Sequence, residues 1–315
     1  MLLKHQGHTG LNINMNESTT SLNISQQLIK KMQLPESFKK IVNDIYNPLM
    51  QLILERKQQQ PLFISINGAQ GTGKSTLTHF LKHLIEAESG FAVAEISLDD
   101  FYITYAERQQ LATDIHPLLL TRGVPGTHDI KLMENTFSAL LEGKPCTVPR
   151  FNKSIDDRED DNKWNQFNNH TPIDVILFEG WCNNSPIQTP EELITPINTL
   201  EQHEDENGIW RTYANEQLKI YHEKIFSHSD MRIMLKASGF ERIYAWRLLQ
   251  EEKLKQNTVV NKHTKIMSNK ELQRFIQHYE RISRHTLNKL PSLADIVIPI
   301  NDDHSIERII QKNEK

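Results

Sequence analysis

One eight-residue stretch constrains the fold more than any other part of the chain. Residues 68–75 read Gly-Ala-Gln-Gly-Thr-Gly-Lys-Ser and match the pattern G-x-x-x-x-G-K-[ST] at every fixed position. The apolar, β-branched run LFISIN precedes this stretch at 62–67, and five apolar residues follow it at helical spacing, from Leu77 to Ile85. We therefore predict a buried strand, a tight glycine turn and a helix in direct succession.

Such an arrangement is suited to binding phosphate groups. Glycines let successive backbone N–H groups turn toward phosphate oxygens, and the N-terminus of the following helix adds a partial positive charge. In this pattern the lysine, here Lys74, reaches the β- and γ-phosphates, and the hydroxyl of Ser75 binds Mg²⁺. The predicted nucleotide-binding residues are Gly68, Ala69, Gln70, Gly71, Thr72, Gly73, Lys74, Ser75 and Thr76.

The rest of the chain alternates between strand-like and helix-like patterns. Four more apolar runs have the character of strands, at 91–98, 174–178, 231–237 and 294–300. Helical patterns lie near 129–142, 214–226, 239–255 and 269–288, and an amphipathic helix that Pro48 kinks precedes the first strand. This alternation predicts an α/β fold of three layers, α/β/α, with a mainly parallel five-stranded sheet.

The N-terminal residues differ in composition from the remainder. Residues 1–24 are rich in Asn, Ser and Thr without a sustained apolar period, so we expect a flexible leader there and a single domain over 25–315. No stretch approaches 18 uninterrupted apolar residues, and the first residues lack the apolar core of a signal peptide. We therefore expect a cytoplasmic protein without a membrane partner.

The overall charge argues against nucleic acid as a partner. The chain carries 36 basic and 40 acidic residues, which give a net charge of −4 and no general attraction to a polyanion. Its two cysteines, Cys146 and Cys182, are too few and too far apart for a disulfide framework or a C-x-x-C metal pair. These observations leave an enzyme or a binding protein for small molecules.

Other motifs narrow the class of nucleotide-binding protein. A GTPase would carry N-K-x-D to recognise guanine, and each Asn-Lys pair of this chain lacks the Asp two residues further on. The D-x-x-G sequence at 205–208 lies in a polar stretch, where we predict a loop. The sequence thus favours a nucleotide-binding protein other than a GTPase.

Carboxylates follow two of the predicted strands. Asp99 and Asp100 end the second strand and Glu179 ends the third, so all three are expected at the edge of the sheet where the phosphate loop lies. Phosphoryl transfer requires positioning, Mg²⁺ and a group that accepts the proton of the attacking hydroxyl. Asp99 is our first candidate for that group, with the choice between Asp99 and Asp100 open.

At this point the sequence resembles a family of kinases. The motif S-x-D-D-F-Y at 97–102 and a strand that ends in Glu-Gly at 179–180 resemble the phosphoribulokinase, uridine kinase and pantothenate kinase group of P-loop kinases. Within this group the chain is similar to D-glycerate 3-kinase and its bacterial relatives, through residues 66–71, 122–129, 149–154, 178–181 and 244–248. These stretches follow the expected order over most of residues 40–300.

The resemblance implies a function and several residue roles. It implies a helical lid and insertions on the P-loop fold, with ATP and Mg²⁺ as cofactors. It also implies transfer of the γ-phosphate to a hydroxyl of a small acid, with D-glycerate giving 3-phosphoglycerate. Asp99 would be the base beside Lys74, Glu179 would hold Mg²⁺ through water, and an arginine of the lid helix would neutralise transition-state charge. We favour Arg247 over Arg242 for that last role.

An acidic substrate also requires cations, and the residues themselves supply candidates. Guanidinium groups bind carboxylates with two hydrogen bonds. The predicted substrate-binding residues between the second and third strands are Arg122, His128, Arg150 and Lys153, together with Asp99. Arg158 lies in an acidic run at 156–161 and either joins this set or pairs with its neighbours, and Asp129 is either functional or a helix cap.

Two alternatives remain open from the sequence. The acceptor could instead be pantothenate, a nucleoside or another hydroxy acid, with the same chemistry. The chain could also be an ATP-binding regulatory protein without turnover, although Lys74, Asp99 and Glu179 are all present. The sequence does not specify the oligomeric state.

Overall fold

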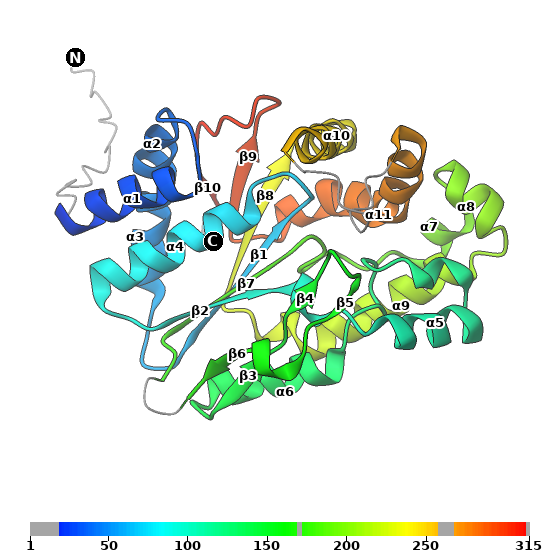
Figure 1. Cartoon of the computed structure of the whole chain (residues 1–315), viewed down its shortest axis with the longest axis horizontal. Coiled ribbons are helices and arrows are strands. Elements are labelled where there is room, and N and C mark those ends of the chain that lie inside the picture. Colours follow the sequence, from blue (N-terminus) through cyan, green and yellow to red (C-terminus); the bar gives the residue numbers. More distant parts are fainter. Residues whose placement is uncertain (1–18, 169–171, 258–267, 313–315) are drawn as a thin grey trace, which may run out of the picture.

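The computed structural model describes residues 19–168, 172–257 and 268–312 and contains a central sheet with the strand order β10-β9-β8-β1-β7-β2 (Figure 1). Five of these strands are parallel: β1 (Leu62–Gly68), β2 (Val93–Ser97), β7 (Val175–Gly180), β8 (Met231–Ala237) and β9 (Ile296–Ile300). They confirm the five predicted strands. A sixth strand, β10 (Ile310–Gln311), pairs antiparallel with β9 and was not predicted, because two residues are too few to show a period.

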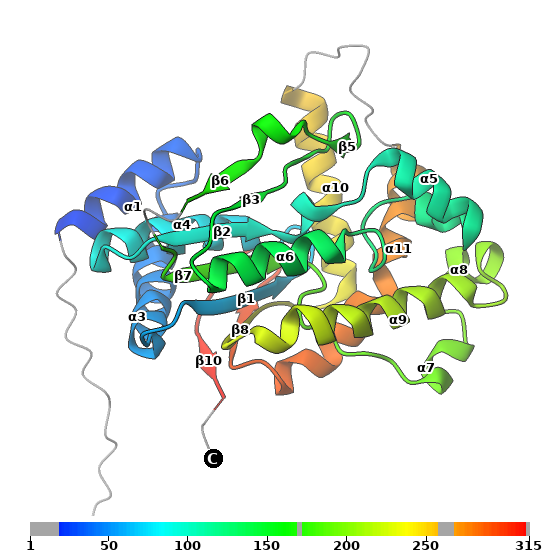
Figure 2. The same cartoon turned by 90° about the horizontal axis from the view of Figure 1, so that it is seen from below.

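Helices cover both faces of the sheet, which confirms the predicted α/β/α layers (Figures 1 and 2). The helices packed on one face are α1 (Thr19–Lys31), α3 (Asn47–Arg56), α4 (Lys74–Ser89), α10 (Phe240–Asn257) and α11 (Asn269–Lys289). The other face carries α6 (Ile130–Leu141) and α9 (Ile209–Lys224). Side chains alternate along a strand, so Ile64 and Ile66 of β1 enter the first core and Phe63 the second.

The segments before β1 differ from the expectation in two respects. Helix α1 begins at Thr19, so the last six residues of the predicted leader are helical, whereas residues 1–18 lie outside the described residues. The short helix α2 (Phe38–Ile41) continues through a π-helical turn (Val42–Tyr46) into α3. Pro48 is the second residue of α3 and follows the π-helical turn directly, so the departure from α-helical geometry lies where its missing N–H and its ring disturb the helix.

Several elements inserted between β2 and β7 were not predicted. They comprise α5 (Tyr105–Asp114), a 3₁₀ turn (Pro117–Leu120), and two short hairpins that pair β3 (Cys146–Val148) with β6 (Asn165–Phe167) and β4 (Phe151–Asn152) with β5 (Asp157–Arg158). Two further short helices, α7 (Pro190–Ile194) and α8 (Thr199–Glu204), lie between β7 and α9. Helix α5 showed no apolar period because the side chain that it buries is Arg108.

The strand order determines where a ligand can enter. Strand β1 has β7 and β2 on one side and β8 and β9 on the other, so the direction of the chain connections reverses at β1. In parallel sheets of this kind, ligands bind at the carboxyl ends of the strands where that reversal occurs. The phosphate loop follows β1 at this point.

Among the helices of the described residues, none is both long and apolar enough to cross a bilayer.

Candidate active site

The predicted phosphate loop forms the turn between β1 and α4. Gly68 is the last residue of β1 and Lys74 the first of α4. Gly71 and Gly73 have φ angles of +84° and +87°, a left-handed conformation that glycine adopts without steric cost. A Cβ atom at Gly71 would also lie 2.8 Å from the Cβ of Trp246 in α10. Gly71 is therefore required both by its backbone conformation and by the packing of α10 on the loop, and Gly73 by its backbone conformation alone.

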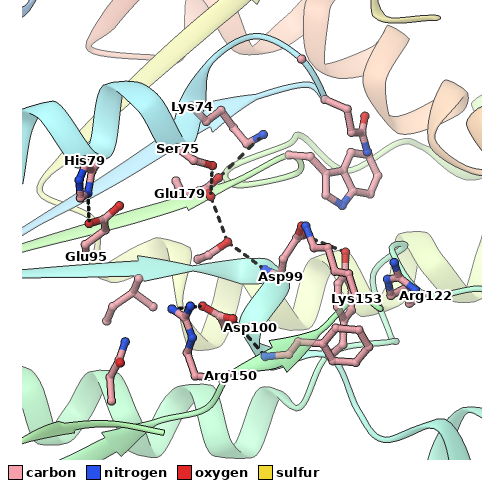
Figure 3. Close-up of a pocket in the computed structure, with 18 of the residues that line it drawn as sticks. Lys74, Ser75, His79, Glu95, Asp99, Asp100, Arg122, Arg150, Lys153 and Glu179 are labelled. Atoms are coloured by element: carbon pink, nitrogen blue, oxygen red, sulfur yellow. Dashed lines mark hydrogen bonds and ion pairs between the residues drawn. The ribbon is translucent and has the colours of Figure 1, made fainter. Parts of the chain in front are cut away.

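Glu179 lies at the centre of a group of polar side chains from three elements (Figure 3). Its Oε1 accepts hydrogen bonds from Ser75 Oγ at 2.9 Å and from Ser97 Oγ at 3.0 Å, and Lys74 Nζ lies 3.8 Å from its Oε2. Strand register explains the grouping, because β7 lies between β1 and β2 and places Glu179 opposite Ile66 on one side and Ser97 on the other.

This group has the chemistry of a magnesium site. Hydroxyl and carboxylate oxygens are the ligands that Mg²⁺ prefers, and proteins usually bind the ion through one or two such groups together with phosphates and water. Ser75 and Glu179 offer two oxygens, already joined by a hydrogen bond. Within the described residues, no cluster of three or more His, Cys, Asp or Glu side chains could form an all-protein metal cage. The residues present thus fit an ion shared with a nucleotide.

Asp99 follows β2 and carries two hydrogen bonds. Its Oδ2 accepts from Lys153 Nζ at 2.6 Å and its Oδ1 accepts from the Tyr102 hydroxyl at 2.9 Å. Burial alone would raise the pKa of Asp99, but Lys153, Lys74 and the Tyr102 hydroxyl outweigh burial and lower that pKa to about 2. The Asp99 carboxylate is therefore charged at any physiological pH.

Asp100 has a different environment from its neighbour. Its Oδ1 accepts from the backbone N–H of Phe151 at 3.2 Å, and its Oδ2 lies 3.6 Å from a guanidinium nitrogen of Arg150. Burial raises the pKa of Asp100 above its ordinary value. Asp100 thus anchors the β4–β5 hairpin, whereas Asp99 is held by side chains at the centre of the pocket.

A pocket of about 840 Å³ joins these groups. The predicted catalytic or substrate-binding residues that line it are Lys74, Asp99, Arg122, Arg150, Lys153 and Arg247. Of the predicted nucleotide-binding residues, Gln70, Gly71, Lys74 and Ser75 line it, while Gly68, Ala69, Thr72, Gly73 and Thr76 complete the turn and the start of α4. Segments that are far apart in the sequence thus line a single cavity.

The cations of the pocket also contact carboxylates of the protein. The guanidinium of Arg122 pairs with Asp156, Arg150 lies near Asp100, and Lys153 bonds Asp99. The side chains of Arg150 and Lys153 remain 51% and 60% exposed. Their exposure leaves Arg150 and Lys153 room to turn toward a ligand, whereas the side chain of Arg122, at 23% exposure, has less.

The structure does not place His128 in the pocket. His128 is buried, its ring stacks on Tyr102 with centroids 4.5 Å apart, and its Nδ1 lies 2.9 Å from the Tyr221 hydroxyl. Burial lowers the pKa of His128 to about 3, so its imidazole is neutral at physiological pH. His128 therefore packs against Tyr102 and supplies no charge to a substrate. The prediction of a substrate-binding role for His128 is wrong.

Three further candidates lie outside the pocket. Arg158 pairs with Asp129 at 3.3 Å and donates to the Tyr102 carbonyl at 3.0 Å. Asp129 caps α6, since its Oδ1 accepts from the N–H of Leu132 at 2.9 Å. Arg242 pairs with Asp302 at 2.5 Å, whereas Arg247 of the same helix faces the pocket. The structure thus places Arg247 at the pocket, and it places Arg158 and Arg242 in ion pairs outside the pocket.

Tyr102 and Tyr279 are pocket residues that were not predicted. Tyr102 is the last residue of the S-x-D-D-F-Y motif, and its hydroxyl donates directly to Asp99. Trp181 and Tyr279 form one wall, with ring centroids 4.9 Å apart, and Trp181 donates to the Gly123 carbonyl at 2.9 Å. Tyr102 lies three residues from Asp99, which is a local signal, whereas Tyr279 comes from α11 and has no signal in the sequence.

Comparison with known proteins agrees with this site. The model of the phosphoribulokinase/uridine kinase family matches residues 63–183, which include the phosphate loop, Asp99 and Glu179. The chain is 33% identical over 233 residues to the uncharacterized kinase mug58 of Schizosaccharomyces pombe, across 71% of this chain and 80% of that protein. It is 32% identical over 231 residues to the chloroplastic D-glycerate 3-kinase of Arabidopsis thaliana, across 70% of this chain but 46% of that protein.

A solved structure shares the fold. The D-glycerate 3-kinase from Cryptococcus neoformans superposes with a TM-score of 0.68 at 22% identity, over 85% of this chain and 99% of that one. Sequence similarity, the shared fold and the grouping of Lys74, Ser75, Asp99 and Glu179 around one pocket all agree. The chain therefore belongs to the phosphoribulokinase/uridine kinase family and is a P-loop small-molecule kinase.

Proposed function

We propose that this kinase transfers the γ-phosphate of ATP to a hydroxyl of a small acid, and that the acid is D-glycerate, which gives 3-phospho-D-glycerate. The observation that carries the proposal is that one pocket holds the phosphate loop, the Asp99 carboxylate and the cations Arg122, Arg150 and Lys153. The similarity to D-glycerate 3-kinases supports this acceptor over a neutral one.

At the nucleotide end, the loop amides and Lys74 bind the phosphates. Mg²⁺, when bound with ATP, would neutralise charge on the transferred phosphoryl group, and Ser75 and Glu179 would hold it. Ser97 supports this arrangement, because its hydrogen bond orients the Glu179 carboxylate toward Ser75. Lys74 contributes a second positive charge 3.8 Å from Glu179.

At the acceptor end, Asp99 orients the attacking hydroxyl. A carboxylate has about four lone-pair positions, so Asp99 can accept a third hydrogen bond beside those from Lys153 and Tyr102. With a pKa of about 2 it is a weak base before the reaction. Its main contribution is therefore to align the hydroxyl oxygen, and it takes the proton as the bond to phosphorus forms.

The cations are assigned by their positions in the pocket. Arg122, Arg150 and Lys153 bind the carboxylate of the acceptor, and Arg247, which extends from α10 on the phosphate-loop side, neutralises charge on the transferred group. Arg122→Ala should raise the KM for the acid by about tenfold, the value of one charge-assisted hydrogen bond, at little change in kcat. An unchanged KM would remove Arg122 from this role.

The decisive experiment is ADP release by the purified protein with Mg²⁺·ATP and a panel of D-glycerate, L-glycerate, pantothenate and uridine. We expect turnover with D-glycerate well above the others, and a product that enzymes specific for 3-phosphoglycerate consume. The Asp99→Asn variant, prepared in the same way, controls for contaminating kinases. Preference for pantothenate or uridine would replace the acceptor, and ADP release that no acceptor stimulates would favour a regulatory ATP-binding protein.

A further inference from the structure

Arg122 belongs to a row of three charged side chains that continues away from the pocket. One oxygen of Asp156 contacts the guanidinium of Arg122, and the other accepts from Arg108 at 3.1 Å. Arg108 also donates to the backbone carbonyls of Asp156 and of Leu120, the latter at 2.9 Å. Asp156 thus joins a pocket arginine to a second arginine behind it.

Arg108 is more deeply buried than Arg122, and Asp156 connects the two. The side chain of Arg108 is 1% exposed, which is exceptional for an arginine and requires the three hydrogen bonds that it makes. Asp156 has a φ angle of +57°, in the left-handed region that aspartate and asparagine enter more readily than other side chains. The Asp156 carboxylate, whose side chain is 40% exposed, lies between the two guanidinium groups and contacts both.

The Arg122 guanidinium is held on a second side by aromatic rings. It lies over the ring of Phe151, 5.4 Å from the centroid, and Phe151 packs edge-on against Tyr102 with centroids 5.1 Å apart. The backbone of Arg122 is fixed as well, because the Tyr279 hydroxyl donates to the Arg122 carbonyl at 3.0 Å. The arginine therefore has a fixed position relative to Tyr102, which in turn binds Asp99.

We propose that Asp156 and Arg108 are positioning residues that hold the Arg122 guanidinium at one distance from Asp99, and so select acceptors whose acidic group lies a set distance from the reacting hydroxyl. The inference rests on the proposed function. Two arginines and one aspartate leave the row with a net charge of +1, so the row still attracts an anion. Asp156 binds one edge of the planar Arg122 guanidinium, and the carboxylate of the acceptor binds another edge of it.

A purely electrostatic role for Asp156 predicts the opposite result. If Asp156 only neutralised Arg122, its removal would increase the positive charge at the acceptor end and lower the KM for an acid. If Asp156 positions Arg122, its removal leaves the guanidinium free to sample other rotamers, and the KM rises. The direction of the change in KM therefore separates the two roles.

The test is Asp156→Asn, which keeps the side-chain shape and suits the left-handed backbone. We expect the KM for the acid to rise about tenfold, with kcat and the KM for ATP unchanged within about twofold. Asp160→Asn is the matched control, because it removes the same charge from an exposed aspartate in the same segment, and it should change none of these values. An acceptor KM that is unchanged or lower in Asp156→Asn overturns the proposal.

A double-mutant cycle connects the effect to Arg122. In an Arg122→Ala background, Asp156→Asn should no longer change the acceptor KM, since there is no guanidinium to position. An undiminished effect in that background overturns the proposal. If Asp156→Asn fails to fold, Arg108→Lys keeps the buried charge but cannot reach the carbonyls of Leu120 and Asp156 together, and it should raise the acceptor KM in the same way.

A crystallographic comparison separates this inference from the proposed function. In wild-type crystals we expect the Arg122 guanidinium over Phe151, and in Asp156→Asn crystals we expect it to leave this position. An arginine that stays over Phe151 in the variant overturns the positioning role. If the wild type phosphorylates none of the acids, the proposed function fails, and the position of Arg122 in the two crystals still decides whether Asp156 holds it.

Discussion

Replacing Asp99 with asparagine tests the core of the proposed chemistry. Asparagine keeps the size of the side chain and one oxygen, so the hydrogen bond from Tyr102 at 2.9 Å can survive. The position 2.6 Å from Lys153 then receives an amide or an uncharged oxygen in place of a carboxylate. The acceptor hydroxyl loses its negatively charged partner while the shape of the pocket is retained.

The expected loss is large and confined to turnover. A positioned base contributes about 10²–10⁴-fold to the rate, which corresponds to about 2.7–5.5 kcal/mol of transition-state stabilisation. We therefore expect kcat to fall by that factor at saturating ATP and acid, measured by ADP release. The Kd for ATP, measured with a fluorescent ATP analogue, should change less than about threefold, because Asp99 acts on Lys74 through charge, while its side-chain hydrogen bonds are with Lys153 and Tyr102.

Asp100→Asn is the matched control, because it makes the same change at the neighbouring residue. Asp100 bonds the N–H of Phe151 and lies 3.6 Å from Arg150, so its loss should loosen the β4–β5 hairpin and reduce kcat by less than about tenfold. Near-normal turnover in Asp99→Asn, or an equal loss in both variants, would refute the assignment of Asp99.

The pH dependence gives an independent check on Asp99. Its pKa of about 2 lies below the ordinary value, so the carboxylate stays ionised as the pH falls and is protonated only near pH 2. The profile of kcat/KM should therefore show no acid limb from this residue between pH 9 and pH 5. An apparent pKa near 6 that Asp99→Asn abolishes would contradict the argument.

Three other residues make further predictions. Gly123→Ala should destabilise the fold by about 2–4 kcal/mol in urea unfolding, because φ is +135° and a Cβ would overlap the Tyr279 hydroxyl. Ser75→Ala should raise the Mg²⁺ concentration for half-maximal rate at least about tenfold, and an unchanged titration would exclude Ser75 as a ligand. His128 has a pKa of about 3 in the fold, so the unfolded chain binds more protons below pH 6.5 and stability falls with falling pH. Between pH 6 and pH 5 the wild type should therefore lose about 1 kcal/mol more unfolding free energy than His128→Phe does. An identical dependence of unfolding free energy on pH in the two proteins would show that the fold does not keep His128 neutral.

The sequence determined the elements whose signals are local. The strand, glycine turn and helix over residues 62–85 are set by neighbouring residues, and the five parallel strands follow from short apolar runs. The arrival of Asp99 and Glu179 at one edge also follows from sequence, since carboxyl ends of parallel strands meet there. For the same reason the family could be identified from these motifs.

Only the tertiary structure decided which cations share the pocket and which are buried elsewhere. Arg122, His128, Arg150 and Arg158 lie in the same insertion with similar local patterns, yet His128 is neutral behind Tyr102 and Arg158 pairs with Asp129. The difference arises from contacts with residues distant in sequence, such as Tyr221 and Asp156, that no local period encodes. A sequence fixes backbone preferences over a few residues, whereas the charge state and direction of a side chain depend on what the whole fold packs around it.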